Sequence, residues 1–476
     1  MNRKGWAKLD NASKIFLATM TSRDTKVFRL SANVREEVDP AILQTALDRT
    51  YEYFGLYHAV MRRGIFWYYL EDSDLRPKVE PDLEVPCAGL YKRDEKNLLF
   101  RVTYYGKRIH LEVFHALSDG TGAMWFLDNL LYHYIDLRYP EALKGKESAV
   151  EGKGSQNELL DDSFERHFGG REDWWDFNPV QSTLGTVTKV GKAVGKAAVN
   201  IGGKSINVVT ESVGLSQRKR REKIYRVRGT KTPDGRIRIV ETEMAVDAVL
   251  KLAKAAGTSL TIYLTALFIE AAHREAPRRR DDWTIAVSIP INLRQFFKSS
   301  TARNFFSTVP VAYTYGLKGD GGDTIEEIAK TIGEEFKGQL TPDKIRDKLA
   351  QLKAYEENPL LRILPRYLKD LLLRTVNALN NRKLSLAISN MGKINLHEDI
   401  DGYVDQLYAI TAAARPQFLS VSHAGRLVVS FMSPFTETDI QRNFVALLTE
   451  QGVAVRVAAN KVDVGELGNM EEEVGA

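Results

Sequence analysis

A stretch without any aromatic side chain, residues 178–223, divides the sequence into two segments that each have the composition of folded protein. The stretch holds nine Lys and Arg against two Glu, a formal charge of +7. Since the whole chain carries +5, the remainder carries −2. The 476 residues are too many for one typical core. We therefore expect two folded bodies, 1–177 and 224–463, and a frayed acidic tail, 464–476.

Two interpretations of the basic stretch remain open. Its apolar residues keep a helical period, which is typical of a basic amphipathic helix that makes weak contact with an anionic membrane surface. Its six Gly and its lack of Trp and Phe favour a flexible, solvated insertion between the two bodies. The residues that set the period are Val187, Val190, Val194, Ala198, Ile201 and Val208.

Both bodies are predicted to be of the α/β (α+β) class, with hairpins in place of a regular βαβ alternation. In the first body, "TKVFRLSANV" (25–34) alternates like a strand. "DPAILQTALDRTYEYFG" (39–55) then opens with Asp-Pro and continues at helical spacing. In the second body, "QFLSVSHAGRLVVSFMSP" (417–434) reads as a hairpin.

Composition excludes several classes of protein. The only cysteine is Cys87, so neither an intrachain disulfide nor a cysteine metal cluster is possible, and we expect no metal. No window of roughly 18 apolar residues is present, and the small net charge does not indicate nucleic-acid binding. We expect a soluble, cytoplasmic protein.

The stretch "FHALSDGTG" (114–122) lies where a predicted strand ends and the helix of "GAMWFLDNLLYHYIDLRY" begins. A neutral imidazole at His115 is suited to take a proton from a hydroxyl or an amine. Asp119, four residues later, is suited to hold the turn by pairing with a cation. Gly120 permits a sharp bend and a close backbone approach. These residues alone favour a structural histidine, and a catalytic histidine is the alternative.

Together with three later segments, "HALSDG" resembles the HxxxDG motif of the CoA-dependent acyltransferase superfamily. These segments are "PINLRQFF" (290–297), "RNFFSTV" (303–309) and "LAISNMG" (386–392), in family order. The superfamily includes chloramphenicol acetyltransferase, plant HxxxD acyltransferases, wax-ester synthases and condensation domains of peptide synthetases. The chain is most similar to bacterial alcohol acetyltransferases. The resemblance covers about 25–175 and 224–460.

The sequence departs from the family in two places. Condensation domains usually carry a second histidine directly before the motif histidine, and here that position is Phe114. The DFGWG motif of the plant enzymes is absent. Both departures favour a stand-alone acyltransferase over the condensation-domain and plant branches.

The resemblance implies two related lobes, each a mixed sheet with helices, with a tunnel between them. It implies that His115 is the general base, that Gly120 sits at the turn and that Asp119 pairs with Arg294 from the second lobe. The resemblance also places Ser389 or Asn390 where it would donate to the thioester or its oxyanion. Further candidate contacts to the substrates are Asn292 and Asn304.

The implied reaction moves an acyl group from acyl-CoA to the hydroxyl of an alcohol or lipid-like acceptor, without a bound cofactor. Two alternatives stay open. One is a condensation-like enzyme that takes the phosphopantetheine thioester of an acyl carrier protein, with 178–223 helping to hold that acidic partner. The other is a binding protein that keeps the fold without turnover. The intact His115 and Asp119 favour an enzyme.

Overall fold

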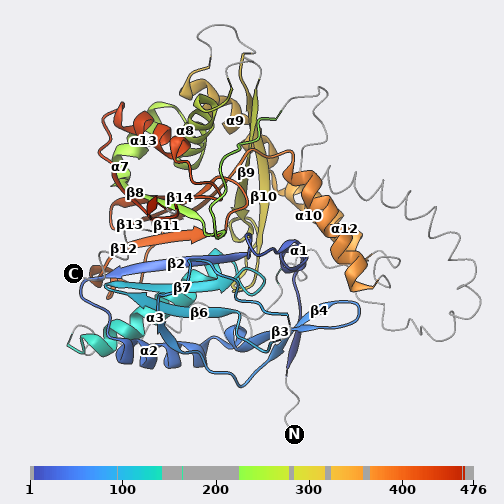
Figure 1. Ribbon diagram of the computed structural model, residues 1–476, viewed down its shortest axis with the longest axis vertical. Coiled ribbons are helices and arrows are strands. Elements are labelled where there is room, and N and C mark those ends of the chain that lie inside the picture. Colours follow the sequence, from blue (N-terminus) through green and yellow to red (C-terminus); the bar gives the residue numbers. More distant parts are fainter. Residues whose placement is uncertain are drawn as a thin grey trace, which may run out of the picture.

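The computed structural model describes a chain with two lobes and a helical pair beside them (Figure 1). The residues described are 5–93, 95–141, 163, 224–277, 283–316, 323–357, 365–463 and 465–466. The basic stretch 178–223 and most of the acidic tail lie outside these residues, so both expectations for the stretch stay predictions.

The first lobe contains a five-stranded sheet whose one face is covered by two helices, α2 (Pro40–Tyr53) and α3 (Gly120–Arg138) (Figure 1). Its strand order is β12-β2-β7-β6-β5. Alternate residues of β7, Ile109, Leu111 and Val113, are fully buried in the core of this lobe. The strands are β2 (Val27–Val34), β5 (Val79–Pro81), β6 (Phe100–Tyr105), β7 (Arg108–Phe114) and β12 (Val404–Thr411).

A small sheet and an N-terminal helix complete the first lobe. The sheet has the order β1-β4-β3, and β3 and β4 form an antiparallel hairpin. The helix, α1, is capped by Asp10, whose side chain accepts a hydrogen bond from the Ser13 main chain at 2.8 Å. The bounds are β1 (Trp6–Lys8), α1 (Asn11–Thr19), β3 (Ala59–Arg63) and β4 (Tyr68–Asp72).

The second lobe is built on a mixed seven-stranded sheet with the order β10-β9-β11-β13-β14-β8-β15. Its most buried helix is α8 (Leu260–Arg274), where Leu264, Leu267 and Phe268 enter the second core. The strands are β8 (Arg238–Ala245), β9 (Thr284–Asn292), β10 (Phe306–Thr314), β11 (Leu386–Lys393), β13 (Gln417–His423), β14 (Arg426–Ser433) and β15 (Arg456–Ala459). The other helices are α7 (Val246–Ala255), α9 (Ile325–Gln339), α10 (Pro342–Glu357), α12 (Arg366–Asn381) and α13 (Asp439–Thr449).

One strand crosses between the lobes. β12 follows β11 in the second half of the chain, yet it pairs antiparallel with β2, with Leu407 opposite Ala32. The first core also takes Ile239 and Met432 from strands of the second sheet. The predicted body 224–463 therefore supplies an edge strand and core residues to the first lobe. Periodicity along the sequence does not reveal such an exchange.

Among the described residues no single helix has the length and apolar character of a membrane span. α7 and α8 have this length and apolar character only when they are taken together, and the pair is bent by 84°.

Candidate active site

His115 lies in the tight turn that joins β7 to α3. Its main-chain N–H donates to the carbonyl of Lys26 at 2.8 Å, and its carbonyl accepts from Nδ2 of Asn304 at 2.8 Å. Lys26, directly before β2, has a positive φ of 57°. Hydrogen bonds from both lobes therefore fix the backbone of His115, independently of the contacts of its side chain.

The imidazole of His115 is held in one tautomer. Its Nδ1 lies 3.1 Å from Oδ1 of Asn304. The orientation of this amide is determined by its other end, because Nδ2 faces three acceptors: His115 O at 2.8 Å, Ser13 Oγ at 3.1 Å and Asp10 Oδ2 at 3.3 Å. An amide oxygen only accepts, so Nδ1 carries the hydrogen and the lone pair is left on Nε2.

Three aromatic rings surround the imidazole. The ring centroids of Phe16, Phe28 and Phe306 lie 4.4, 4.9 and 5.5 Å from that of His115. Burial in this apolar shell lowers the pKa of His115, and the charge of Asp119 opposes the shift only in part. His115 nevertheless keeps part of its surface accessible. The ring is thus a neutral base at neutral pH.

Asp119 points away from the imidazole and uses both carboxylate oxygens for structure. Oδ1 caps α3 by accepting from the main chains of Thr121 and Gly122, at 3.1 and 3.0 Å. Oδ2 accepts from Nη1 of Arg294 at 2.7 Å and from the Phe305 main chain at 3.0 Å. The predicted ion pair between Asp119 and Arg294 is confirmed, and both side chains are more than nine-tenths buried.

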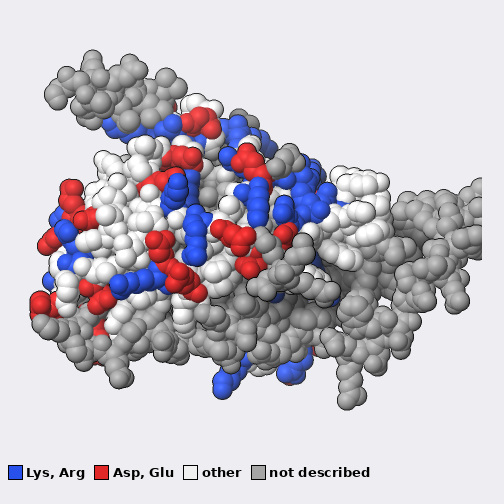
Figure 2. All heavy atoms as spheres, turned by 90° about the horizontal axis from the view of Figure 1, so that it is seen from below, with Lys and Arg blue, Asp and Glu red and all other residues white. Residues whose placement is uncertain are grey.

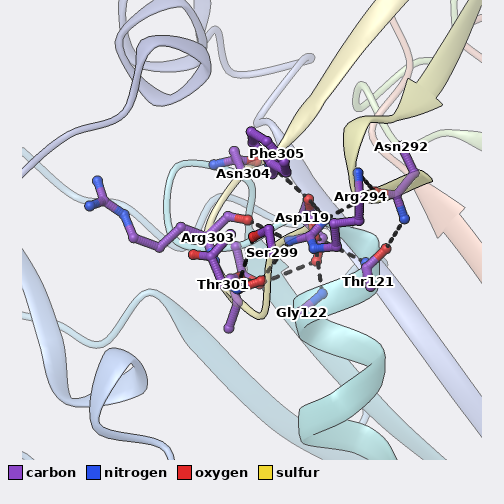
Figure 3. A network of polar contacts seen from close by, with 12 residues as sticks. Asp119, Thr121, Gly122, Asn292, Arg294, Ser299, Thr301, Arg303, Asn304 and Phe305 are labelled. Carbon is purple, nitrogen blue, oxygen red and sulfur yellow. Dashed lines mark hydrogen bonds and ion pairs between the residues drawn. The ribbon is translucent and has the colours of Figure 1, made fainter. Parts of the chain in front are cut away.

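Arg294 holds the loop that carries Asn304 by hydrogen bonds to its main chain. Its Nη2 donates to the carbonyls of Thr301 at 2.7 Å and Arg303 at 2.9 Å, as Figure 3 shows. Asp119 binds the same loop at Phe305. Asp119 and Arg294 therefore bind main-chain groups on both sides of Asn304. Asn304 in turn sets the tautomer of His115.

The close backbone approach that the sequence predicts for Gly120 lies instead at Gly122. A Cβ at Gly122 would be 2.1 Å from the carbonyl oxygen of Ala302, which is already bonded to Ser118 Oγ at 2.6 Å. A Cβ at Gly120 would meet only Met391 Cε, at 3.5 Å. Gly120 is the first residue of α3 and lacks a positive φ, so neither the approach nor the bend requires a glycine there.

The N-terminal helix supplies residues that no sequence motif marks. Oδ1 of Asp10 accepts from Ser13 Oγ at 2.7 Å, while Oδ2 is within 3.3 Å of Asn304. Ser13 Oγ also lies 2.9 Å from the Ala116 carbonyl oxygen, and Phe16 covers the imidazole. "DNAS" signals a helix start, but nothing in the sequence indicates that this helix packs on His115.

The remaining predicted residues have partners of their own. Asn292 accepts from the Arg294 main chain at 3.0 Å and donates to Thr121 at 3.1 Å, which ties the lobes together. Asn390 donates to Thr261 at 2.7 Å and accepts from the Gly392 main chain at 2.8 Å. The carbonyl of Ser389 accepts from Ser420. None of the described contacts joins Ser389 or Asn390 to His115, so their binding of a thioester stays a prediction.

Within the described residues, no group of three or more His, Cys, Asp or Glu is placed to hold a metal ion. Cys87 is buried, and burial raises the pKa of its thiol. That thiol is a poor nucleophile.

No family model matches the chain, and no curated protein matches its sequence. Several solved structures match almost all of it. TRI3 trichothecene 15-O-acetyltransferase from Fusarium sporotrichioides is 10% identical, with a TM-score of 0.57 and 94% of each chain covered. TRI101 from F. graminearum, complexed with coenzyme A and T-2 mycotoxin, is 10% identical, with a TM-score of 0.57, covering 95% of this chain and 99% of that one.

The first condensation domain of the calcium-dependent antibiotic synthetase, in complex with a substrate analogue, is 14% identical. Its TM-score is 0.57, and the match covers 94% of this chain and 96% of the domain. Identities this low show shared architecture alone. The chain therefore has the two-lobed fold common to condensation domains and trichothecene acetyltransferases, the fold that its ordered motifs predict.

Proposed function

We propose that this protein is an acyltransferase that moves an acyl group from a thioester to a hydroxyl, with His115 as general base. The observation that carries the proposal is the tautomer of the His115 imidazole and its lack of charge at neutral pH. Nδ1 is occupied by Asn304, the pKa is lowered by burial, and the lone pair of Nε2 is left for an incoming proton donor.

In the proposed step, Nε2 of His115 takes the proton of the acceptor hydroxyl while that oxygen attacks the thioester carbonyl carbon. The tetrahedral intermediate collapses as the carbon–sulfur bond breaks. The imidazolium returns its proton to the leaving thiolate, so the ring ends neutral. The lowered pKa makes the imidazolium a stronger acid, which suits it to protonate a thiolate whose reference pKa is about 8.5.

Asp119 and Arg294 take no part in the proton transfer in this account. Their charges are mutually neutralised and bonded to main-chain groups. We assign to them the positioning of the 301–305 loop, and to Asn304 the positioning of the imidazole.

Coenzyme A is the donor that we favour. A structure with the same fold was solved with coenzyme A and a mycotoxin, and another is described as an O-acetyltransferase. A carrier-protein thioester is the second candidate, because condensation domains share the fold equally well. Phe114 before the motif histidine supports the first candidate.

The test is a thiol-release assay with acyl-CoA donors of increasing chain length and a panel of primary alcohols. His115→Ala is expected to lower turnover by a factor of about 10²–10⁴, the usual contribution of a general base. His133→Ala, a change in α3 beyond the turn, is the matched control and should keep the wild-type rate. Equal turnover of wild type and His115→Ala would refute the proposal. Ester formed from a carrier-bound acyl group, with none from acyl-CoA, would select the second donor.

A further inference from the structure

Large apolar side chains are exposed together on the β3–β4 hairpin and on α12. Ile65 and Trp67 at the hairpin tip are 78% and 55% exposed, and Tyr367 and Leu371 on α12 are 67% and 61% exposed. Phe66 and Leu368 add to the same two elements. We call these six residues the hairpin–helix patch: Ile65, Phe66, Trp67, Tyr367, Leu368 and Leu371.

Direct bonds make the hairpin and the helix one surface. The main-chain N–H of Arg366 donates to the Ile65 carbonyl at 3.2 Å. Beside it, Tyr68 donates to Asp370 on the next turn of α12 at 3.0 Å. The patch is therefore continuous, although its two halves lie 300 residues apart in the chain.

The main-chain carbonyls at the hairpin tip accept hydrogen bonds from groups of the protein itself. The carbonyl of Gly64 accepts from Nη1 of Arg366 at 2.9 Å, and that of Phe66 accepts from Nζ of Lys369 at 3.1 Å. The carbonyl of Trp67 accepts from the Gly64 main chain at 2.8 Å. With the Ile65 bond, all four carbonyls of residues 64–67 have donors. Burying a carbonyl without a donor is costly, and these four carbonyls avoid that cost.

Basic side chains outnumber acidic ones around the patch. Arg374 donates to the carbonyl of Ala18 at 2.6 Å, which brings α1 and its Lys14 beside α12. Burial, and next the charge of Lys14, lower the pKa of Lys369, so these ammonium groups are close enough to repel. On β3, β4, α1 and α12 the charged residues are Lys14, Arg62, Arg63, Arg366, Lys369 and Arg374 against Glu71, Asp72 and Asp370.

Figure 2 shows this charge distribution on the side of the molecule that holds β4 and α12. Lys and Arg gather there next to an uncharged area, at the right of the coloured surface. Exposed aromatic and aliphatic side chains bordered by Lys and Arg are the composition of a protein surface that sits at the level of lipid headgroups.

We propose that the hairpin–helix patch docks on an anionic lipid bilayer, with the side chains of residues 65–67 among the headgroups and the basic residues against phosphates. Charge selects the bilayer over a second copy of the chain. A two-fold dimer through this patch would place the same positive groups face to face, whereas an anionic surface neutralises them.

The proposal is independent of the acyl transfer, because docking is measured without turnover. It bears on that reaction through α1, which packs on α12 and carries Phe16 against His115. Docking would place the helix that covers the candidate base next to the lipid surface.

The test is co-sedimentation of the full chain with vesicles of phosphatidylcholine alone and of phosphatidylcholine mixed with phosphatidylglycerol. Binding is expected to the mixed vesicles and to weaken as salt is raised. The double variant Ile65→Ser, Trp67→Ser should bind about tenfold more weakly or worse. The matched control is Leu83→Ser, Tyr105→Ser, which removes side chains that are 85% and 74% exposed outside the patch.

Three outcomes would overturn the proposal. One is a wild-type chain that binds neither kind of vesicle. Another is binding that the patch variant leaves unchanged, which would assign the contact elsewhere, for example to 178–223. The third is a dimer in sedimentation velocity that the patch variant dissociates, which would make a second copy the occupant.

Discussion

At the scale of single residues, the most specific feature of this protein is how Asn304 binds His115. Its amide accepts from Nδ1 of the ring and donates to the carbonyl of the same residue. Because Asp10 and Ser13 lie at the donating end, the amide cannot turn over without losing these bonds. The tautomer of the candidate base is therefore set by a residue 189 positions away.

The dependence of kcat/KM on pH tests this arrangement. Burial lowers the pKa of His115, so activity should fall as pH falls through a midpoint below the ordinary value of about 6.5. Asn304 stabilises the imidazolium, so Asn304→Ala should move this midpoint to still lower pH while kcat falls about tenfold, the worth of one orienting hydrogen bond. Asn443→Ala on α13 should leave the midpoint in place. A midpoint that rises in Asn304→Ala would contradict the assigned tautomer.

The motif made part of this site predictable. The resemblance implies the pair of Asp119 and Arg294, and it fits the need of a buried carboxylate for a cation. The structure bonds the amide of Asn304 to His115, Asp10 and Ser13, and its contact with substrate stays a prediction. Asp10, Ser13 and Phe16 lie about 100 residues before His115 in a segment without a motif, so only tertiary packing reveals them.

Removal of the buried carboxylate gives a stability prediction. Asp119→Ala leaves Arg294 buried without its carboxylate and uncaps α3, so it should cost about 3–5 kcal/mol in free energy of unfolding. The matched control is Asp136→Ala on the same helix, whose pair with Arg49 is exposed and should contribute less than about 1 kcal/mol. Chemical denaturation measures both.

The charge-reversed double variant Asp119→Arg, Arg294→Asp is not expected to have the stability of the wild type. Both oxygens of Asp119 also accept main-chain N–H groups, which an arginine cannot replace. Full recovery of stability in the reversed pair would show that only the ion pair matters.

At the scale of elements, the contact between the first turn of α3 and the 301–305 loop sets how the lobes meet. Gly122 lets the Ala302 carbonyl approach the helix, and Ser118 bonds that same carbonyl. The sequence offers Gly120 and Gly122 in one short run, and periodicity cannot tell which of them a distant loop approaches.

Paired alanine variants separate the two glycines. Gly122→Ala places a methyl group 2.1 Å from a carbonyl oxygen, so it should destabilise the protein by at least about 1–3 kcal/mol and lower activity. Gly120→Ala meets only the end of a flexible methionine and should be tolerated. Thermal unfolding of both variants checks this, and the reverse order of stability would refute the assigned contact.

At the scale of the whole molecule, the two lobes are joined near both ends of β2 and β7. Asp119 and Arg294 pair beyond the end of β7, and Arg108 at its start lies 3.1 Å from Glu241 of the second lobe. β12 crosses between them as an edge strand of the first sheet. The α/β class and both lobes follow from local sequence patterns. The crossing strand does not, because its paired residues, such as Leu407 and Ala32, are 375 positions apart.

In the proposed reaction, a thioester and its acceptor meet at Nε2 of His115. The most direct measurement is a crystal structure of the His115→Ala variant with an acyl-CoA bound. We expect the thioester carbonyl to lie between the lobes, with space for the acceptor oxygen about 2.6–3.2 Å from the position that Nε2 occupies in the wild type. An acyl chain bound elsewhere, with the space at residue 115 closed by Phe16, Phe28 and Phe306, would contradict it.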